Sequence, residues 1–159
     1  MKFPRTIRLD ESDAQVYETP ATPGEWAVPG SFVFLDADPS KLAGKRQQAF
    51  GHGFLGTESF GWSTLVEVAE ISQAEYEAVV DRLAAHFVEH YGAPDMATAL
   101  PTAREEAQFA VGICDHQTHT LLMLERELGE DGIVERFRVV RPNAADHENV
   151  KLWTFVDDD

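Results

Sequence analysis

The sequence predicts an α+β fold: one globular domain over residues 1–159, with a mainly antiparallel sheet and about three helices packed chiefly on one face. Three observations lead to this prediction. A strand-like segment runs directly into a well-marked helix between Phe60 and Gly92. Two apolar segments around Gly129 and Gly132 pair in one register as a hairpin. The 43% hydrophobic content of the 159 residues suffices for a single core.

The N-terminal third alternates short extended segments with turns. Residues 3–9 alternate apolar and polar side chains, which predicts a half-buried strand. Phe32–Leu35 is a continuous apolar run, typical of a strand that is covered on both faces. Asp38 followed by Pro39 predicts the N-cap and first position of a short helix that ends near Phe50.

The middle of the chain carries the clearest helix signals. Residues 62–71 are rich in β-branched and apolar side chains and predict a strand. Ser72 and Glu75 then match the S-x-x-E capping box, and Gly92 supplies a C-terminal stop. A second capping box is predicted at Thr102–Glu105. The helix that it opens has a stripe of small side chains, which permits close approach to a neighbouring helix: Ala103, Ala107, Ala110 and Cys114.

The segments on either side of Gly129–Gly132 predict a β-hairpin. With a four-residue loop there, two opposite-charge pairs and three apolar pairs align in one register, and a slip by one residue would lose them. The pairs are Leu128–Ile133, Arg126–Glu135, Glu125–Arg136, Leu124–Phe137 and Leu122–Val139. The alternative is a helix over Thr118–Leu128, because its residues are good helix formers. A last strand is predicted over Val150–Val156, before a disordered acidic tail at 157–159.

The charge of the chain excludes several classes of partner. Thirteen Lys and Arg against 28 Asp and Glu give a net charge of −15, which repels nucleic acid and anionic membranes. No apolar run approaches the ~20 residues of a membrane span, and the amino end lacks the apolar segment of a secretion signal. A single cysteine fits a reducing compartment. We therefore expect a cytoplasmic protein.

Two short strings match known signatures without the expected context. Gly51–Gly56 fits G-x-G-x-x-G, but it follows a predicted helix instead of a strand, so we expect no dinucleotide cofactor. His86–His90 matches the H-x-x-E-H string of zinc peptidases. The apolar stripe of the predicted helix turns His86, Glu89 and His90 largely towards solvent, which argues against a zinc site there.

Cys114, His116 and His119 form the densest local group of metal-ligand side chains. They lie between a predicted helix and the hairpin, where ligands can converge on one ion. The spacing matches no established zinc motif, and we favour a buried cysteine with polar capping of the helix end. These three residues are nevertheless the candidate ligands for zinc or another transition metal, and no other cofactor is expected.

Several segments, spread over most of the chain, share one family resemblance. They are Lys2–Phe3, Thr6–Arg8, Pro23–Gly30, Gly53–Gly56, Ser59–Gly61, Glu125–Leu128, Asp131–Ile133 and Val140–Pro142. The chain resembles a proteobacterial domain family of unknown function, for which no activity, ligand or catalytic residue is established. The resemblance therefore implies no site residue. The resemblance also implies that such genes sit near molybdoenzyme or formate dehydrogenase maturation genes, which would suit an accessory protein.

A coherent scaffold without a coherent catalytic group favours a binding protein over an enzyme. We expect a small acidic cytoplasmic accessory protein that assists enzyme maturation and binds another protein or a small polar ligand. The alternative is a metal-binding protein or metal-dependent enzyme that uses Cys114, His116 and His119. The sequence leaves self-association into homo-oligomers open.

Overall fold

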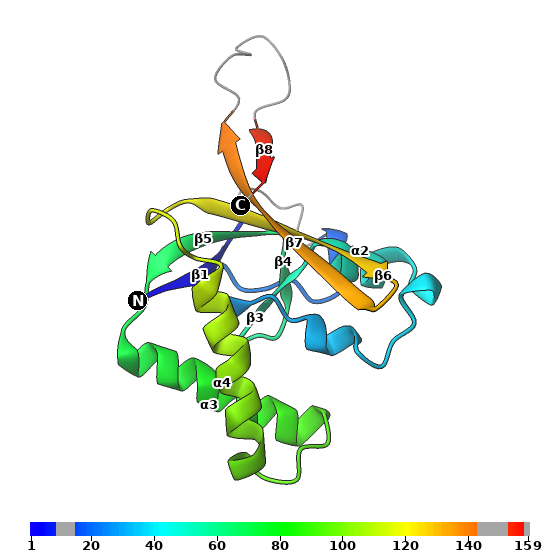
Figure 1. Cartoon of the computed structure of the whole chain (residues 1–159), viewed down its shortest axis with the longest axis vertical. Coiled ribbons are helices and arrows are strands. Elements are labelled where there is room, and N and C mark those ends of the chain that lie inside the picture. The colour runs from blue at the N-terminus through cyan, green and yellow to red at the C-terminus, as the bar shows by residue number, and fades with distance from the viewer. Residues whose placement is uncertain (9–14, 143–152, 158–159) are drawn as a thin grey trace.

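Two antiparallel sheets and the helices packed against them make up the α+β fold that the sequence predicts (Figure 1). The computed structural model describes residues 1–8, 15–142 and 153–157. The larger sheet has the order β1-β5-β6-β7-β8 and the smaller one β2-β3-β4. The strands are β1 (Lys2–Ile7), β2 (Ala27–Val28), β3 (Phe54–Gly56), β4 (Trp62–Ser63), β5 (Leu65–Glu70), β6 (Leu121–Gly129), β7 (Gly132–Pro142) and β8 (Trp153–Asp157). The helices are the 3-10 helices η1 (Ser31–Phe34) and η2 (Pro39–Lys41) and the α-helices α2 (Gly44–His52), α3 (Gln73–His90) and α4 (Met96–Gly112).

The two sheets share one apolar interior. A backbone bridge between Arg5 and Trp26 joins them along β1 and β2. Phe54 of the smaller sheet packs with apolar side chains of the larger one, namely Val66, Val68, Leu122, Leu124 and Val139. The next residue, Leu55, points the opposite way, into a second core with α3 and α4. The pair of helices therefore covers the outer side of the smaller sheet.

The predicted hairpin is confirmed in its predicted register. All five predicted residue pairs are present between β6 and β7. Gly129 also pairs with Gly132, so the connection is the two-residue turn Glu130–Asp131 and is shorter than predicted. Gly132 has a φ of +122°, a conformation that favours glycine. The helical alternative over Thr118–Leu128 is wrong, because cross-strand pairing outweighs local helix propensity there.

Between Phe60 and Gly92, the predicted helix is confirmed, whereas the single predicted strand is wrong in part. The Ser72 hydroxyl accepts from the Glu75 amide, and the Glu75 carboxylate accepts from the Ser72 amide, both at 3.1 Å. The single strand predicted over residues 62–71 divides at Thr64 into β4 and β5, which belong to different sheets. One extended segment therefore serves both sheets.

The strand predicted at Phe32–Leu35 is wrong, since these residues lie in and just after the 3-10 helix η1. A 3-10 turn directs successive side chains around its axis. Phe32 contacts the ring of Phe87 in α3, whereas Phe34 is buried against the ring of Phe50. Leu35 is 72% exposed. The apolar run is thus divided between two cores and solvent, which the sequence pattern alone does not reveal.

Two helix starts also differ from the prediction. Asp38 accepts hydrogen bonds from Ser40, but only the short η2 follows it, and α2 begins at Gly44. The second capping box is wrong, because α4 begins at Met96 with Asp95 as its N-cap. Pro101 lies inside this helix. Its missing amide removes one helical hydrogen bond, and burial of the alanines on either side, Ala99 and Ala103, stabilises the turn that contains it.

The remaining elements agree with the sequence in part. The small-residue stripe of α4 is confirmed: Ala103, Ala107 and Ala110 are buried in the core shared with α3, and Cys114 is buried between the sheets. The last strand is present as β8 and includes Asp157, which the sequence assigned to the tail. Residues 150–152 and 158–159 lie outside the described ranges. Among the helices in the described part of the chain, none combines the length and apolarity that a membrane crossing requires.

Arg126 of β6 connects this strand to several neighbouring segments. Its side chain is fully buried, because the alternation along β6 places it on the same face as Leu122 and Leu124. All of its N–H groups find acceptors: the carbonyls of Pro29, Ala49, Phe50 and Gly53, the Ser31 hydroxyl and the Glu135 carboxylate. Two of these carbonyls lie in the last turn of α2, where the helix dipole favours a cation. One side chain therefore ties β6 to η1, α2 and β3.

Replacing Arg126 by methionine is expected to lower the free energy of unfolding by about 3–5 kcal/mol, because Glu135 then lies partly buried without its cation. Urea denaturation measures this loss. Arg136→Met is the matched control, since Arg136 pairs with Glu127 at 2.9 Å but is 56% exposed. Its loss should stay within about 1 kcal/mol. Equal losses in the two variants would contradict the role assigned to Arg126.

Candidate functional site

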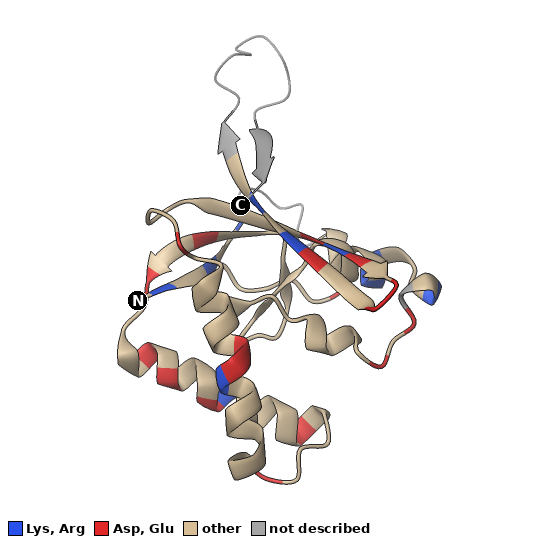
Figure 2. Cartoon of the chain, in the orientation of Figure 1, with Lys and Arg blue, Asp and Glu red and all other residues tan. Residues whose placement is uncertain are grey.

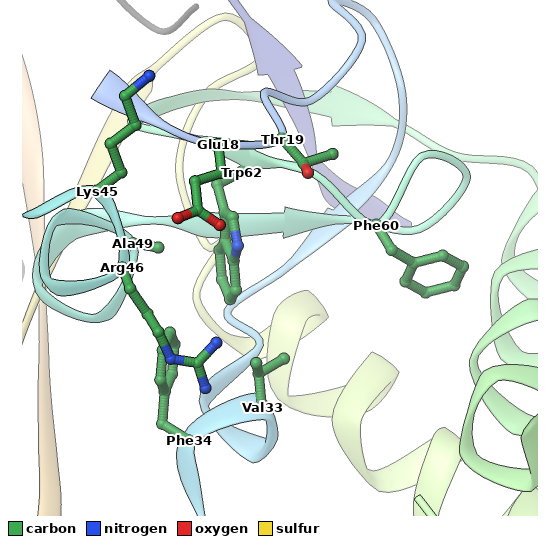
Figure 3. A pocket seen from close by; sticks show the side chains of 9 residues that line it. All are labelled: Glu18, Thr19, Val33, Phe34, Lys45, Arg46, Ala49, Phe60 and Trp62. Atoms are coloured by element: carbon green, nitrogen blue, oxygen red, sulfur yellow. The ribbon is translucent and has the colours of Figure 1, made fainter. Parts of the chain in front are cut away.

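A pocket of about 200 Å³ opens between α2, η1 and β4. Its lining combines aromatic rings with charged side chains and consists of Glu18, Thr19, Val33, Phe34, Lys45, Arg46, Ala49, Phe60 and Trp62. Figure 3 shows the Trp62 indole among these side chains, with the Glu18 carboxylate beside it. The Arg46 guanidinium lies near Phe34 and Val33, and the Lys45 ammonium points outward.

The Trp62 indole is held as a fixed wall. A Cβ atom at Gly53 would approach the ring to 2.7 Å, so glycine there lets the indole lie flat against the chain. The guanidinium carbon of Arg126 lies 5.9 Å from the Trp62 ring and 5.7 Å from the Phe34 ring. The two rings are themselves 5.4 Å apart. The same buried arginine that connects the fold therefore supports two aromatic walls of the pocket.

Phe60 forms the side of the pocket nearest the helices. Its φ is +53°, a left-handed conformation that is uncommon for a bulky residue. The ring stacks on His86 of α3, with centroids 3.7 Å and planes 3° apart. Backbone strain of this kind persists only where the surroundings hold it, and it clusters at functional sites.

The charged side chains of the pocket form no ion pairs with described residues. Elsewhere in the described ranges the arginines that contact a glutamate are Arg5, Arg82, Arg104, Arg126, Arg136 and Arg138. Lys45, Arg46 and Glu18 instead face the pocket or its rim without such a partner. Figure 2 shows the basic positions of α2 on the opposite side of the molecule from the acidic α3.

Helix stability does not explain the position of these two cations. Lys45 and Arg46 lie in the first turn of α2, where the helix dipole disfavours positive charge. No acidic residue lies in that turn, and Ala43 provides no side-chain cap. Arg46 is instead held over the Phe34 ring, with its guanidinium carbon 5.8 Å from the ring centroid. The arrangement leaves its N–H groups available to a ligand.

The three predicted metal ligands lie in different environments. Cys114 is buried in the core between the sheets. The side chain of His119 is 76% exposed, and its Nδ1 lies 3.2 Å from the Glu67 carboxylate. The His116 carbonyl accepts from the Lys2 ammonium at 2.6 Å. Within the described ranges, no three His, Cys, Asp or Glu side chains are arranged to hold a metal ion. The geometry adds no support to the metal site, which stays a prediction.

The zinc-peptidase string divides between surface and pocket wall. Glu89 and His90 are exposed, as the apolar stripe of α3 predicts. His86 is only partly exposed, because its ring covers Phe60. Burial lowers the pKa of His86, and the neighbouring His90 lowers it further while Glu89 acts in the opposite direction.

Two of the three glycines of the G-x-G-x-x-G string, Gly53 and Gly56, have packing roles. Gly53 ends α2 and contacts Trp62, and Gly56 leaves room for the carboxylate of Glu25. Glu25 is 3% exposed and accepts four hydrogen bonds, from the amides of Thr22, Glu58 and Ser59 and from the Ser59 hydroxyl. The interpretation as a helix end and turn is consistent with this geometry, and no sequence pattern marks the buried glutamate.

Several of the segments that carry the family resemblance contact one another in the fold. The Ser59 hydroxyl donates a hydrogen bond to Glu25, which links residues 59–61 to residues 23–30. The Arg126 guanidinium donates to the Gly53 carbonyl, which links residues 125–128 to residues 53–56. A family model described as a family of unknown function, DUF6505, matches residues 1–158, and the chain belongs to this family. The predicted membership of a family of unknown function is thereby confirmed. No curated protein and no solved structure matches the chain.

Acidification through the range in which histidine titrates is expected to weaken the His86–Phe60 contact. Because the pKa of His86 is lowered in the folded state, its neutral ring contributes stability that is complete above the unfolded pKa. This contribution is lost as the pH falls through the folded pKa. His86→Phe keeps a stacked ring and removes the titration, so the melting temperature should fall less between about pH 7 and about pH 5 than in the wild type.

Thermal unfolding at the two pH values measures this difference. His90→Gln is the comparison variant, because His90 is exposed and its substitution leaves both the Phe60 stack and the titrating His86 in place. We expect its melting temperature still to fall on acidification, by slightly less than in the wild type, because His90 contributes to the lowered pKa of His86. If His86→Phe showed the full pH dependence of the wild type, the stack would not be the titrating contact.

Proposed function

We propose that this protein binds a small ligand whose flat apolar part lies against Trp62. The observation that supports this most directly is the fixed, partly exposed indole in a pocket with unpaired charged groups. Small-molecule sites typically combine apolar walls with a few placed polar groups. Among the described residues, none accepts a hydrogen bond from the Trp62 indole N–H. A ligand in the pocket is able to accept this bond.

A small ligand fits this site better than a second protein does. The aromatic walls line a concave pocket, whereas a protein partner needs a broad complementary surface. The ligand thus corresponds to the small polar molecule expected from the sequence. The accessory role in enzyme maturation rests on the family resemblance alone, and we retain it as a compatible part of the proposal.

Removing the indole should weaken binding. A screen of small polar aromatic fragments by ligand-observed NMR provides the probes, and Trp62→Ala is expected to weaken the hits by about tenfold or more, because it removes the stacking surface. Phe109→Ala is the matched control, since it removes an aromatic ring that is 47% exposed on α4, outside the pocket lining. If Trp62→Ala bound the hits as tightly as the wild type does, this pocket would be excluded as the binding site.

A second variant blocks the pocket without opening a cavity in the core. Thr19 is exposed at the pocket wall, and its hydroxyl forms no hydrogen bond with a described residue. Thr19→Phe should therefore fill the pocket and leave the fold intact, which circular dichroism and the melting temperature verify. Loss of the same hits in both variants would separate a binding defect from a folding defect.

A further inference from the structure

We infer that the ligand is a small aromatic zwitterion of the amino acid class, with its carboxylate at Arg46 and its ammonium group at Glu18. This inference rests on the proposed function and names the kind of ligand that the same pocket selects. The ring of such a ligand lies against Trp62.

Unpaired opposite charges in one pocket support this assignment. Glu18 and Arg46 line the same cavity, yet they form no ion pair with each other or with any other described residue. In a chain whose net charge is −15, an arginine readily finds a glutamate, as six arginines in the described ranges do. A ligand that carries both charges satisfies the two groups at once.

A ligand with one charge satisfies only half of the site. A simple anion would bind Arg46 but place negative charge beside the Glu18 carboxylate. A simple cation would suit Glu18 and leave Arg46 opposed by a like charge. Lys45, whose ammonium points outward at the rim, adds long-range attraction for the carboxylate end.

The geometry of Arg46 suits a carboxylate. Its guanidinium lies over the Phe34 ring, which restrains the planar group and leaves the N–H edges free for a two-point contact. Thr19 contributes a hydroxyl without a described hydrogen-bond partner at the same wall. Arg46 is thus placed before any ligand arrives, so little ordering of this side chain is required on binding.

The size of the pocket matches a ligand of about one amino acid. Its volume of about 200 Å³ is below the roughly 300–1,000 Å³ that is typical of sites for drug-sized molecules. A nucleotide or a peptide would extend well beyond it. A single ring that carries an amino acid head group is the class that matches the walls, the charges and the volume together.

Three matched probes test the inference on the full chain: L-phenylalanine, L-phenylalaninamide, which lacks the carboxylate, and N-acetyl-L-phenylalanine, which lacks the ammonium group. Titration calorimetry or ligand-observed NMR measures their dissociation constants. We expect each single-charge probe to bind about tenfold more weakly than L-phenylalanine, because it loses one charge-assisted contact.

Two substitutions assign the two ends. Arg46→Gln should remove the preference for L-phenylalanine over its amide and keep the preference over the N-acetyl probe. Glu18→Gln should do the reverse. Lys41→Gln is the control, because it removes an exposed positive charge of η2 outside the pocket lining and should change none of the three constants. All three side chains are exposed, so unchanged melting temperatures are expected throughout.

The outcomes separate this inference from the proposed function. If N-acetyl-L-phenylalanine or the amide binds as tightly as L-phenylalanine, the zwitterion assignment is wrong. If none of the probes binds, the assignment is also wrong, but fragments that Trp62→Ala weakens would still support a small-ligand site. If neither the probes nor any fragment depends on Trp62, both proposals fail.

Discussion

The buried guanidinium of Arg126 is the constraint on which the rest of the structure depends. A buried charge is costly unless every polar atom around it is paired. The N–H groups of Arg126 point in fixed directions within one plane, so their acceptors must lie at defined places. Pro29 beside η1, the last turn of α2 and Gly53 before β3 supply them. Three loosely connected segments are thereby positioned against β6 by one side chain, and the rings of Phe34 and Trp62 pack over it.

Two acidic side chains, Glu135 and Glu106, lie near the positive charge of Arg126. Glu135 contacts the guanidinium, and Glu106 of α4 accepts from the Gly30 amide at 3.2 Å. Burial raises the pKa of Glu106, and the nearby Glu135 raises it further, whereas the Gly30 bond and Arg126 act in the opposite direction. The raised pKa favours the protonated form of Glu106 beside the ion pair of Arg126 and Glu135. The stability contributed by neutral Glu106 is complete below its unfolded pKa and is lost as the pH rises through its folded pKa, the opposite direction to His86.

The sequence predicted those elements whose signals are local. The capping box of α3 and the register of the β6–β7 hairpin involve residues that are near in sequence, so pattern and propensity agree there. The strand expected at Phe32–Leu35 failed because its side chains are divided between two cores by contacts with α3 and α2. The pairing of Arg126 with Glu135 was predicted, but the burial of Arg126 was not. Its burial follows from the alternation with Leu122 and Leu124 along β6, and its charge hides that pattern in the sequence. The pocket brings Glu18, Arg46 and Trp62 together from separate segments, and no motif marks them.

Departures from local rules concentrate at this pocket. Phe60 has a left-handed backbone conformation, Lys45 and Arg46 oppose the dipole of α2, and the pocket charges form no ion pairs with described residues. His119 also has a positive φ, of +74°, but its main-chain amide donates to the Val68 carbonyl at 2.7 Å and its ring contacts Glu67. These two contacts account for the positive φ of His119, just before β6. At the pocket, by contrast, Glu18, Lys45 and Arg46 have no ion-pair partner among the described residues, and placed polar groups of this kind are characteristic of binding sites.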